Sequence, residues 1–171
     1  RNLPAHTGVC RRDVDSGKPV SPIRLRPAVR SDERMLWLLR QDPSVVRNSL
    51  TGRAISWAEH RRWFARMLRN GAGIQWIIED ARQKRVGQVR LAFEPRKSAT
   101  IHIGIDRRHR GKGYGLSAIA AAVYRAASEH GIRKVVATIL SNNQASKVAF
   151  RRAGFAFKSS KGRVETWQWQ N

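Results

Sequence analysis

The sequence of 171 residues contains a single cysteine, Cys10. A lone cysteine excludes an intramolecular disulfide and favours a reducing compartment. No apolar run approaches the roughly 20 residues that a membrane-spanning helix needs, and the N-terminus lacks the apolar core of a signal peptide. These absences predict a cytoplasmic protein with no membrane partner.

Acidic residues are also scarce: 12 Asp and Glu stand against 34 Lys and Arg, which gives a formal net charge of +22. Such a charge attracts polyanions, including nucleic acid and nucleotide-linked ligands. The basic residues are spread through every segment, so the charge predicts only non-specific contact with nucleic acid and identifies no partner. Hydrophobic residues at 41% and six tryptophans exclude wholesale disorder.

Residues 1–21 hold two prolines, two glycines and no hydrophobic periodicity, which predicts a flexible extension or a linker. Because the first residue is Arg1 rather than Met, the sequence leaves open whether another domain precedes it. Residues 22–171 have the length of a single domain, and their apolar spacing predicts a mixed α/β fold. Strands are expected at 23–27, 76–79, 86–93, 100–106, 134–140, 155–158 and 164–170, and helices at 31–40, from 56 onward, at 116–127 and at 143–154.

Cap residues mark several of these helices. Ser31 is expected to cap the first, and Ser56 with Glu59 forms a capping box for the second. Asn143 is expected to begin the last helix and Gly154 to end it.

The segment Arg108–Gly115 is rich in glycine and basic residues, and it lies between a predicted strand and a predicted helix. Glycine turns bring backbone N–H groups close to a ligand, and the first turn of a helix favours negative charge. The spacing fits neither the nucleoside-triphosphate loop nor the dinucleotide fingerprint. We predict a pyrophosphate site here. Its residues are Arg108, Arg110, Gly111, Lys112, Gly113, Tyr114 and Gly115.

Two motifs carry a family resemblance. Arg108–Gly113 resembles the Arg/Gln-x-x-Gly-x-Gly/Ala loop of the GNAT acetyltransferase superfamily, and Asn143–Phe155 is similar to its Asn-x-x-Ala/Ser-x-x-x-Tyr/Phe-x-x-x-Gly-Phe signature. The resemblance implies a mixed, mostly antiparallel central sheet of six to seven strands with about four helices. It also implies acetyl-coenzyme A as cosubstrate, no metal, and direct transfer of acetyl to a small-molecule amine.

In this family the fourth strand presents backbone N–H groups to the coenzyme because it splays away from the fifth. The matching residues here are Ile103, Gly104 and Ile105, and Gly104 is expected to leave room for the pantetheine arm. The second motif implies further coenzyme contacts. These are Asn143, Ser146 and Phe150.

The catalytic groups depart from the family pattern. Phe150 stands where many members have a tyrosine that protonates the thiolate, which leaves Ser146 as substitute or an unassisted departure. Thr100 stands where relatives often carry a glutamate base. His102, two residues on, and Glu79, on an adjacent strand, are the candidate bases, and for His102 an ordinary hydrogen-bonded strand histidine is the alternative.

The first two helices resemble a subgroup of bacterial amino-sugar N-acetyltransferases that act on a UDP-linked 4-amino sugar in pseudaminic acid biosynthesis. Ribosomal-protein N-terminal acetyltransferases share part of this pattern, so a protein N-terminus or a small-molecule amine is the alternative acceptor. Arginines could bind the diphosphate, an aromatic ring could stack on the base, and core packing is the alternative for the aromatics. The expected acceptor residues are Arg40, Arg47, Trp57, His60 and Trp63.

Three further questions stay open in the sequence. A catalytically silent module that binds coenzyme or nucleic acid is the alternative to an enzyme. Trp167 and Trp169 share one strand face, which predicts core or dimer-interface packing, with a substrate wall as the other possibility. Both a monomer and a homodimer fit the sequence.

Overall fold

The computed structural model describes residues 21–171, which form one seven-stranded sheet in the order β1-β2-β3-β4-β5-β7-β6. The strands are β1 (Ile23–Pro27), β2 (Gly73–Asp80), β3 (Arg85–Glu94), β4 (Ser98–Ile105), β5 (Lys134–Leu140), β6 (Ala156–Lys161) and β7 (Val164–Gln170). The helices are α1 (Glu33–Gln41), α2 (Pro43–Arg47), α3 (Trp57–Asn70), α4 (Tyr114–His130) and α5 (Gln144–Arg152), with 3-10 turns η1 (Arg30–Asp32) and η2 (Arg107–His109).

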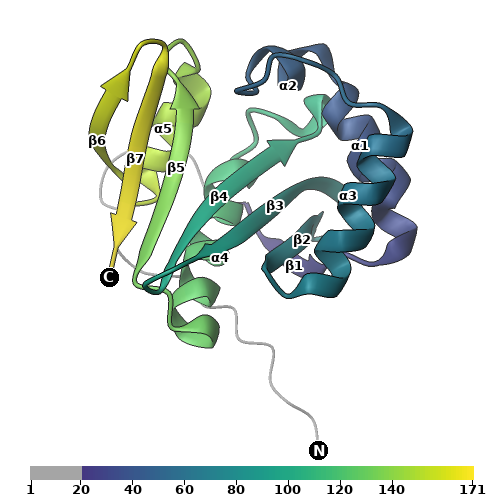
Figure 1. The fold of residues 1–171 in the computed structure, drawn as a ribbon, viewed down its shortest axis with the longest axis horizontal. Helices are drawn as coiled ribbons and strands as arrows, with labels where there is room; N and C mark the ends of the chain where they lie inside the picture. Colours follow the sequence, from purple (N-terminus) through teal and green to yellow (C-terminus); the bar gives the residue numbers. More distant parts are fainter. Residues whose placement is uncertain (1–20) are drawn as a thin grey trace, which may run out of the picture.

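The sheet is antiparallel except between β4 and β5, which run parallel. The predicted mixed, mostly antiparallel sheet is therefore confirmed. Each face has its own apolar core. α4 and α5 pack on one face around residues such as Val89 and Ile101, whereas α1 and α3 cover the other face around Ile77 and Phe64 (Figure 1).

β4 and β5 separate along their length. Only three residue pairs join them, from Ser98 with Lys134 to Thr100 with Val136. Beyond Thr100 the two strands diverge, as Figure 1 shows where β4 turns toward α2 and β5 stays beside β7. The splay that the resemblance implied is present in this chain.

The helix starts are partly as predicted. Ser56 caps α3 by accepting a hydrogen bond from the Glu59 N–H at 3.1 Å, but the Glu59 carboxylate pairs with Arg53 instead of closing the capping box. Ser31 is not a cap, because it lies inside η1 and α1 begins only at Glu33. The short helix α2 was not predicted, and its start is fixed by Asp42, which accepts hydrogen bonds from two α2 N–H groups.

The C-terminal helix and strand follow the prediction closely. Asn143 caps α5, and Gly154 follows its end with φ of 87°. Trp167 is buried and Trp169 is partly buried against the same core, so both tryptophans pack inside the domain.

The predicted extension over residues 1–21 lies outside the described residues except for Ser21. Within the described part of the chain, no helix combines the length and the apolar character that a bilayer span requires.

Candidate active site

The loop between β4 and α4 has the backbone of an anion cradle. Gly111 and Gly113 adopt φ of 73° and 82°, in the left-handed region that other residues avoid. α4 begins directly after Gly113, and no side chain of a described residue caps its first turn. The N–H groups of this first turn have no acceptor within the helix, so they are available to a phosphate.

The two predicted phosphate-binding arginines also hold the loop together. Arg108 forms an ion pair with Asp106 at 2.9 Å, and this contact lowers the pKa of Asp106 to about 2. Arg110 donates to the Ile105 carbonyl at 2.9 Å and lies 3.7 Å from Asp42, at the start of α2. Lys112 is exposed beside them, so the loop keeps positive charge at its surface.

The free edge of β4 faces β5. The Asp106 N–H donates to the Val86 carbonyl on β3 at 2.9 Å, and backbone groups along a strand point alternately to its two sides. The N–H groups of Ile103 and Ile105 therefore face β5, from which β4 has already separated. These two amides fit the predicted role of holding the coenzyme arm and the carbonyl oxygen.

The expectation for Gly104 needs correction on both counts. By the same alternation its N–H faces β3, with which it pairs at Gln88. A Cβ at Gly104 would lie 3.3 Å from a methyl carbon of Leu39, so the missing side chain makes room for α1. Gly104 therefore positions α1 against β4 and does not open a path for the pantetheine arm.

α5 contributes one polar group near the expected thiol position. The Asn143 side chain accepts a hydrogen bond from the Ser146 N–H at 3.2 Å. The Ser146 residue is partly exposed, and its hydroxyl forms no hydrogen bond with another described residue. Phe150 is only 4% exposed and packs edge-on against Phe155 at 4.9 Å. Its surroundings give Phe150 a packing role in the core rather than a place at the coenzyme.

The candidate base His102 is surrounded by positive charge. It pairs directly across the sheet with Arg90, and Arg40 lies on α1 above β4. The pKa of His102 is lowered to about 4, first by desolvation among these side chains and then by the charges of Arg90 and Arg40. The ring is nevertheless exposed, so solvent screens part of this effect. His102 is neutral at pH 7 and can accept a proton.

The other candidate base lies elsewhere. Glu79 is buried and bonds to Arg26 at 2.9 Å, in a cluster that also contains Asp32 and Arg85. Glu79 pairs across the sheet with Arg85, which precedes Arg90 by five residues, or about 17 Å of strand. The structure therefore does not bring Glu79 together with His102, and its carboxylate is used in an ion-pair network.

The structure does not bring the predicted acceptor residues together in one place. Arg40 and Trp63 lie on the helices that cover the His102 face, whereas Trp57 packs against Trp37 at the start of α3. Arg47 lines a separate cavity of about 230 Å³ with Arg107 and Arg110 at the glycine loop.

His60 is not an acceptor ligand. It is completely buried, its Nε2 lies 3.0 Å from the Glu33 carbonyl, and its ring stacks on Phe64. Burial lowers the pKa of His60, so the ring stays neutral. The role for His60 is to join α1 and α3.

Sequence reasoning missed Arg90. Its guanidinium carbon lies 5.4 Å from the ring centre of Trp63, and it forms no ion pair with any described residue. Burial lowers the pKa of Arg90, and the charge of Arg40 lowers it further. The sequence does show the polar pair Gln88 and Arg90 alternating with Val89 and Leu91 on β3, but only the covering helices make that polar face part of a site.

Three regions of the site suit three parts of a reaction. The glycine loop is suited to a pyrophosphate, the open edge of β4 to a thioester arm, and the face with His102, Arg40 and Arg90 to a second substrate. Among the described residues, no cluster of three or more His, Cys, Asp or Glu side chains could hold a metal.

Comparisons with known proteins agree with the fold. A family model described as an acetyltransferase (GNAT) domain matches residues 23–156. A spermidine N-acetyltransferase from Vibrio cholerae, in complex with CoA and spermine, has a TM-score of 0.77 at 20% identity, over 86% of this chain and 95% of that chain. A domain from Methanocaldococcus jannaschii DSM 2661 has a TM-score of 0.77 at 23% identity, over 88% and 99% of the two chains. No protein with a curated description matches the sequence.

Proposed function

Because the chain belongs to the GNAT acetyltransferase family and is an acetyl-coenzyme-A-dependent N-acetyltransferase, we propose that its acceptor is an amine that also carries negative charge. A nucleotide-linked amino sugar is the best candidate. The observation that supports this is the positive charge of the acceptor face, where Glu59, the acid that acts on Arg40, is already ion-paired with Arg53. Arg40 and Arg90 flank His102, and no acidic residue among those described pairs with either arginine.

The charge argues against a polyamine acceptor, although solved structures with this fold include spermidine acetyltransferases. One positive charge about 8 Å from one arginine is repelled by about 2 kcal/mol at an effective dielectric constant near 20. A polycation beside Arg40 and Arg90 meets this repulsion more than once. A diphosphate gains by the same arithmetic, and arginine can bind it with two hydrogen bonds.

The proposed chemistry uses the groups that the site brings together. The acceptor nitrogen attacks the thioester carbonyl carbon, a nitrogen–carbon bond forms, and the carbon–sulfur bond breaks. The N–H groups of Ile103 and Ile105 stabilise the carbonyl oxygen as it gains charge, and such a donor contributes about 3 kcal/mol. His102 takes the proton from the amine, directly or through water. We assign the protonation of the departing thiolate to the Ser146 hydroxyl, in place of the tyrosine of other family members.

An acceptor panel tests the function. Release of the coenzyme A thiol is followed with a UDP-linked 4-amino sugar, the same sugar without the nucleotide, spermidine, and a peptide N-terminus. We expect the highest kcat/KM for the UDP-linked sugar. Equal or faster turnover of spermidine contradicts the proposal. Tight coenzyme binding without turnover of any acceptor identifies the silent module instead.

A second measurement tests the base. We expect His102→Ala to lower kcat at least tenfold while the Kd for coenzyme A changes less than twofold. The His102 side chain lies on the proposed acceptor face of β4, whereas the free β4 amides point along the sheet toward β5. An unchanged kcat removes His102 as the proton acceptor.

A further inference from the structure

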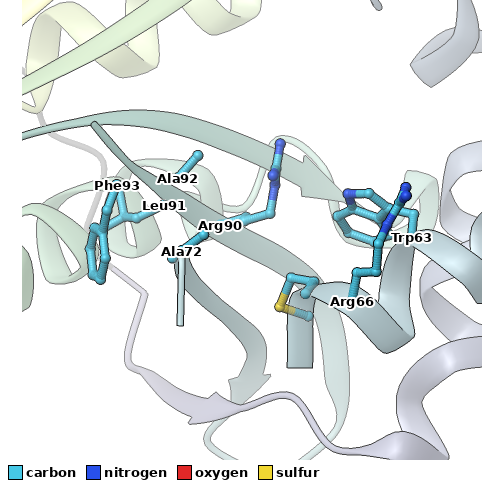
Figure 2. Close-up of a pocket in the computed structure, with 9 residues that line it drawn as sticks. Trp63, Arg66, Ala72, Arg90, Leu91, Ala92 and Phe93 are labelled. Atoms are coloured by element: carbon cyan, nitrogen blue, oxygen red, sulfur yellow. The ribbon is translucent and has the colours of Figure 1, made fainter. Parts of the chain in front are cut away.

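A cavity of about 320 Å³ lies beside Arg90, between the C-terminal half of α3 and the paired ends of β2 and β3 (Figure 2). None of its lining residues is acidic. They are Trp63, Arg66, Met67, Ala72, Gly73, Arg90, Leu91, Ala92 and Phe93. We call this cavity the arginine pocket. Its volume is at the lower end of the range of about 300–1,000 Å³ for small-molecule sites.

The two arginines of the pocket come from different elements and extend toward the same side. In Figure 2, Arg66 rises from α3 and Arg90 from β3, with the Trp63 ring between them. Arg66 is exposed and Arg90 is half-buried. Neither guanidinium forms an ion pair or a hydrogen bond with any described residue. A half-buried, unpaired guanidinium is costly unless a ligand completes it.

Trp63 controls how Arg90 presents its donors. The guanidinium carbon lies 5.4 Å from the Trp63 ring centre, within the range of a cation–π contact. A guanidinium that lies over an aromatic face keeps its N–H groups at the edge, where they can bind two oxygens at once. Trp63 is therefore a positioning residue for Arg90, and its indole is not required to contact the ligand.

We propose that the arginine pocket binds a phosphate group of the acceptor, with Arg90 as the bidentate ligand and Arg66 as the second cation. This inference rests on the proposed function and specifies its substrate class: a phosphorylated amine. Two guanidiniums without a carboxylate match a dianion better than a single carboxylate. The site is also close to the chemistry, because Arg90 is the direct cross-strand neighbour of His102. The apolar lining at Met67, Leu91 and Phe93 leaves space for an uncharged part of the same molecule.

Calorimetric titration with UDP and with inorganic pyrophosphate tests the pocket. The protein is first saturated with coenzyme A so that the glycine loop is occupied. We expect the double variant Arg66→Gln with Arg90→Gln to weaken UDP binding at least tenfold. The matched control is Arg62→Gln with Arg69→Gln, which removes two exposed charges from the same helix α3 but none from the pocket, and we expect a change of less than twofold.

The outcomes separate the pocket from the overall charge. Equal losses in the two double variants, or no UDP binding to the coenzyme-saturated protein, overturn the proposal. Thermal unfolding within a few degrees of the parent protein shows that both variants fold. If the UDP-linked amino sugar is acetylated with an unchanged KM in the pocket variant, the pocket assignment fails while the proposed function stands. If UDP binding depends on the pocket but no sugar is acetylated, the phosphate site stands and the acceptor is wrong.

The role of Trp63 has a separate test. We expect Trp63→Leu to raise the KM for the phosphorylated acceptor about tenfold with little change in kcat, and Trp63→Phe to restore most of the affinity. A purely structural role predicts instead a parallel loss of kcat and thermal stability, without rescue by phenylalanine.

Discussion

At the scale of single residues, the proposed acceptor face is defined by two arginines that form no ion pair with any described residue. Beyond the effect of burial, Arg40 of α1 lowers the pKa of Arg90 on β3, and both arginines lower the pKa of His102 on β4. The nearby acids already form other contacts. Glu59 binds Arg53, and Asp42 caps α2. A bound anion would relieve the repulsion between the arginines and would make His102 a stronger base. An anionic acceptor of the proposed kind would thus contribute to its own activation.

The pKa of His102 reports this coupling directly. Removing a neighbouring positive charge stabilises the imidazolium, so Arg90→Gln is expected to raise the pKa of His102 from about 4 toward its ordinary value near 6.5. An NMR titration of the histidine ring measures the shift. Arg62→Gln, on the exposed surface of α3, serves as control and is expected to leave the value unchanged. An identical titration curve in the Arg90 variant contradicts the assignment.

Asp32 is the residue whose loss is expected to cost the most stability. Its carboxylate is 1% exposed, accepts from the Val29 N–H and pairs with Arg26 and Arg85. Burial alone would raise its pKa, but the hydrogen bonds from Arg26 and Val29 leave the pKa of Asp32 below its ordinary value. Removing one partner of a buried pair typically costs about 3–5 kcal/mol.

Asp32→Asn is therefore expected to lower the free energy of unfolding by about 3 kcal/mol at pH 7, the lower end of that range, since Arg26 is partly exposed. A depressed pKa contributes stability above the unfolded value near 3.9, and that contribution is lost as the pH falls through the folded value. The difference between variant and parent should thus shrink below about pH 4. Denaturant unfolding at pH 7 and at pH 3 measures it, and a difference independent of pH contradicts the ion-pair account.

At the scale of elements, the separation of β4 from β5 and the start of α4 make one continuous surface. The free amides of Ile103 and Ile105 lead to the glycine loop, which Arg110 ties to the start of α2. Arg110 thereby joins the predicted coenzyme loop to α2. The left-handed backbone at Gly111 and Gly113 suits the loop to the predicted pyrophosphate.

Gly111→Ala is expected to weaken coenzyme A binding about tenfold, because a Cβ at φ of 73° strains the loop by about 1–2 kcal/mol. Gly131→Ala is the matched control at the other end of α4. It has φ of 62°, and a Cβ at either glycine would meet no atom within 4 Å. Calorimetry should show a normal Kd for the control despite a similar loss of thermal stability. Equal Kd values in both variants would falsify the loop assignment.

At the scale of the whole molecule, the formal charge of +22 surrounds a site that is itself positive. Such a field raises the encounter rate of anionic ligands, and salt screens it with a Debye length of about 10 Å at 0.1 M. Steering therefore depends on the charge of the acceptor, whereas the chemistry at the β4 edge does not.

The kcat/KM for a UDP-linked amino sugar is expected to fall several-fold between about 50 and 500 mM salt. The same sugar without its nucleotide should show little dependence on salt. Steady-state kinetics with both acceptors at a fixed saturating coenzyme concentration separates the acceptor from the coenzyme. A uniform response of the two acceptors argues against electrostatic recognition.

The sequence by itself determined most of the elements and the glycine loop, because these depend on local properties, but it did not predict the short helix α2. Apolar patterns located the strands, as alternation at 100–106 and as a continuous apolar run at 134–140. Asn143 and Gly154 marked the ends of α5, and the glycine spacing marked the predicted coenzyme loop, where Gly111 and Gly113 adopt left-handed backbone. The loop motif also led to the family, which the match over residues 23–156 shows.

Only the tertiary structure decided which polar residues meet. Cross-strand register placed Arg90 beside His102 and moved Glu79 into a separate ion-pair network, and the docking of α1 on α3 buried His60. Gly104 likewise proved to make room for Leu39, 65 positions earlier in the chain. Contacts between residues far apart in the chain depend on register and helix packing, which local periodicity does not encode.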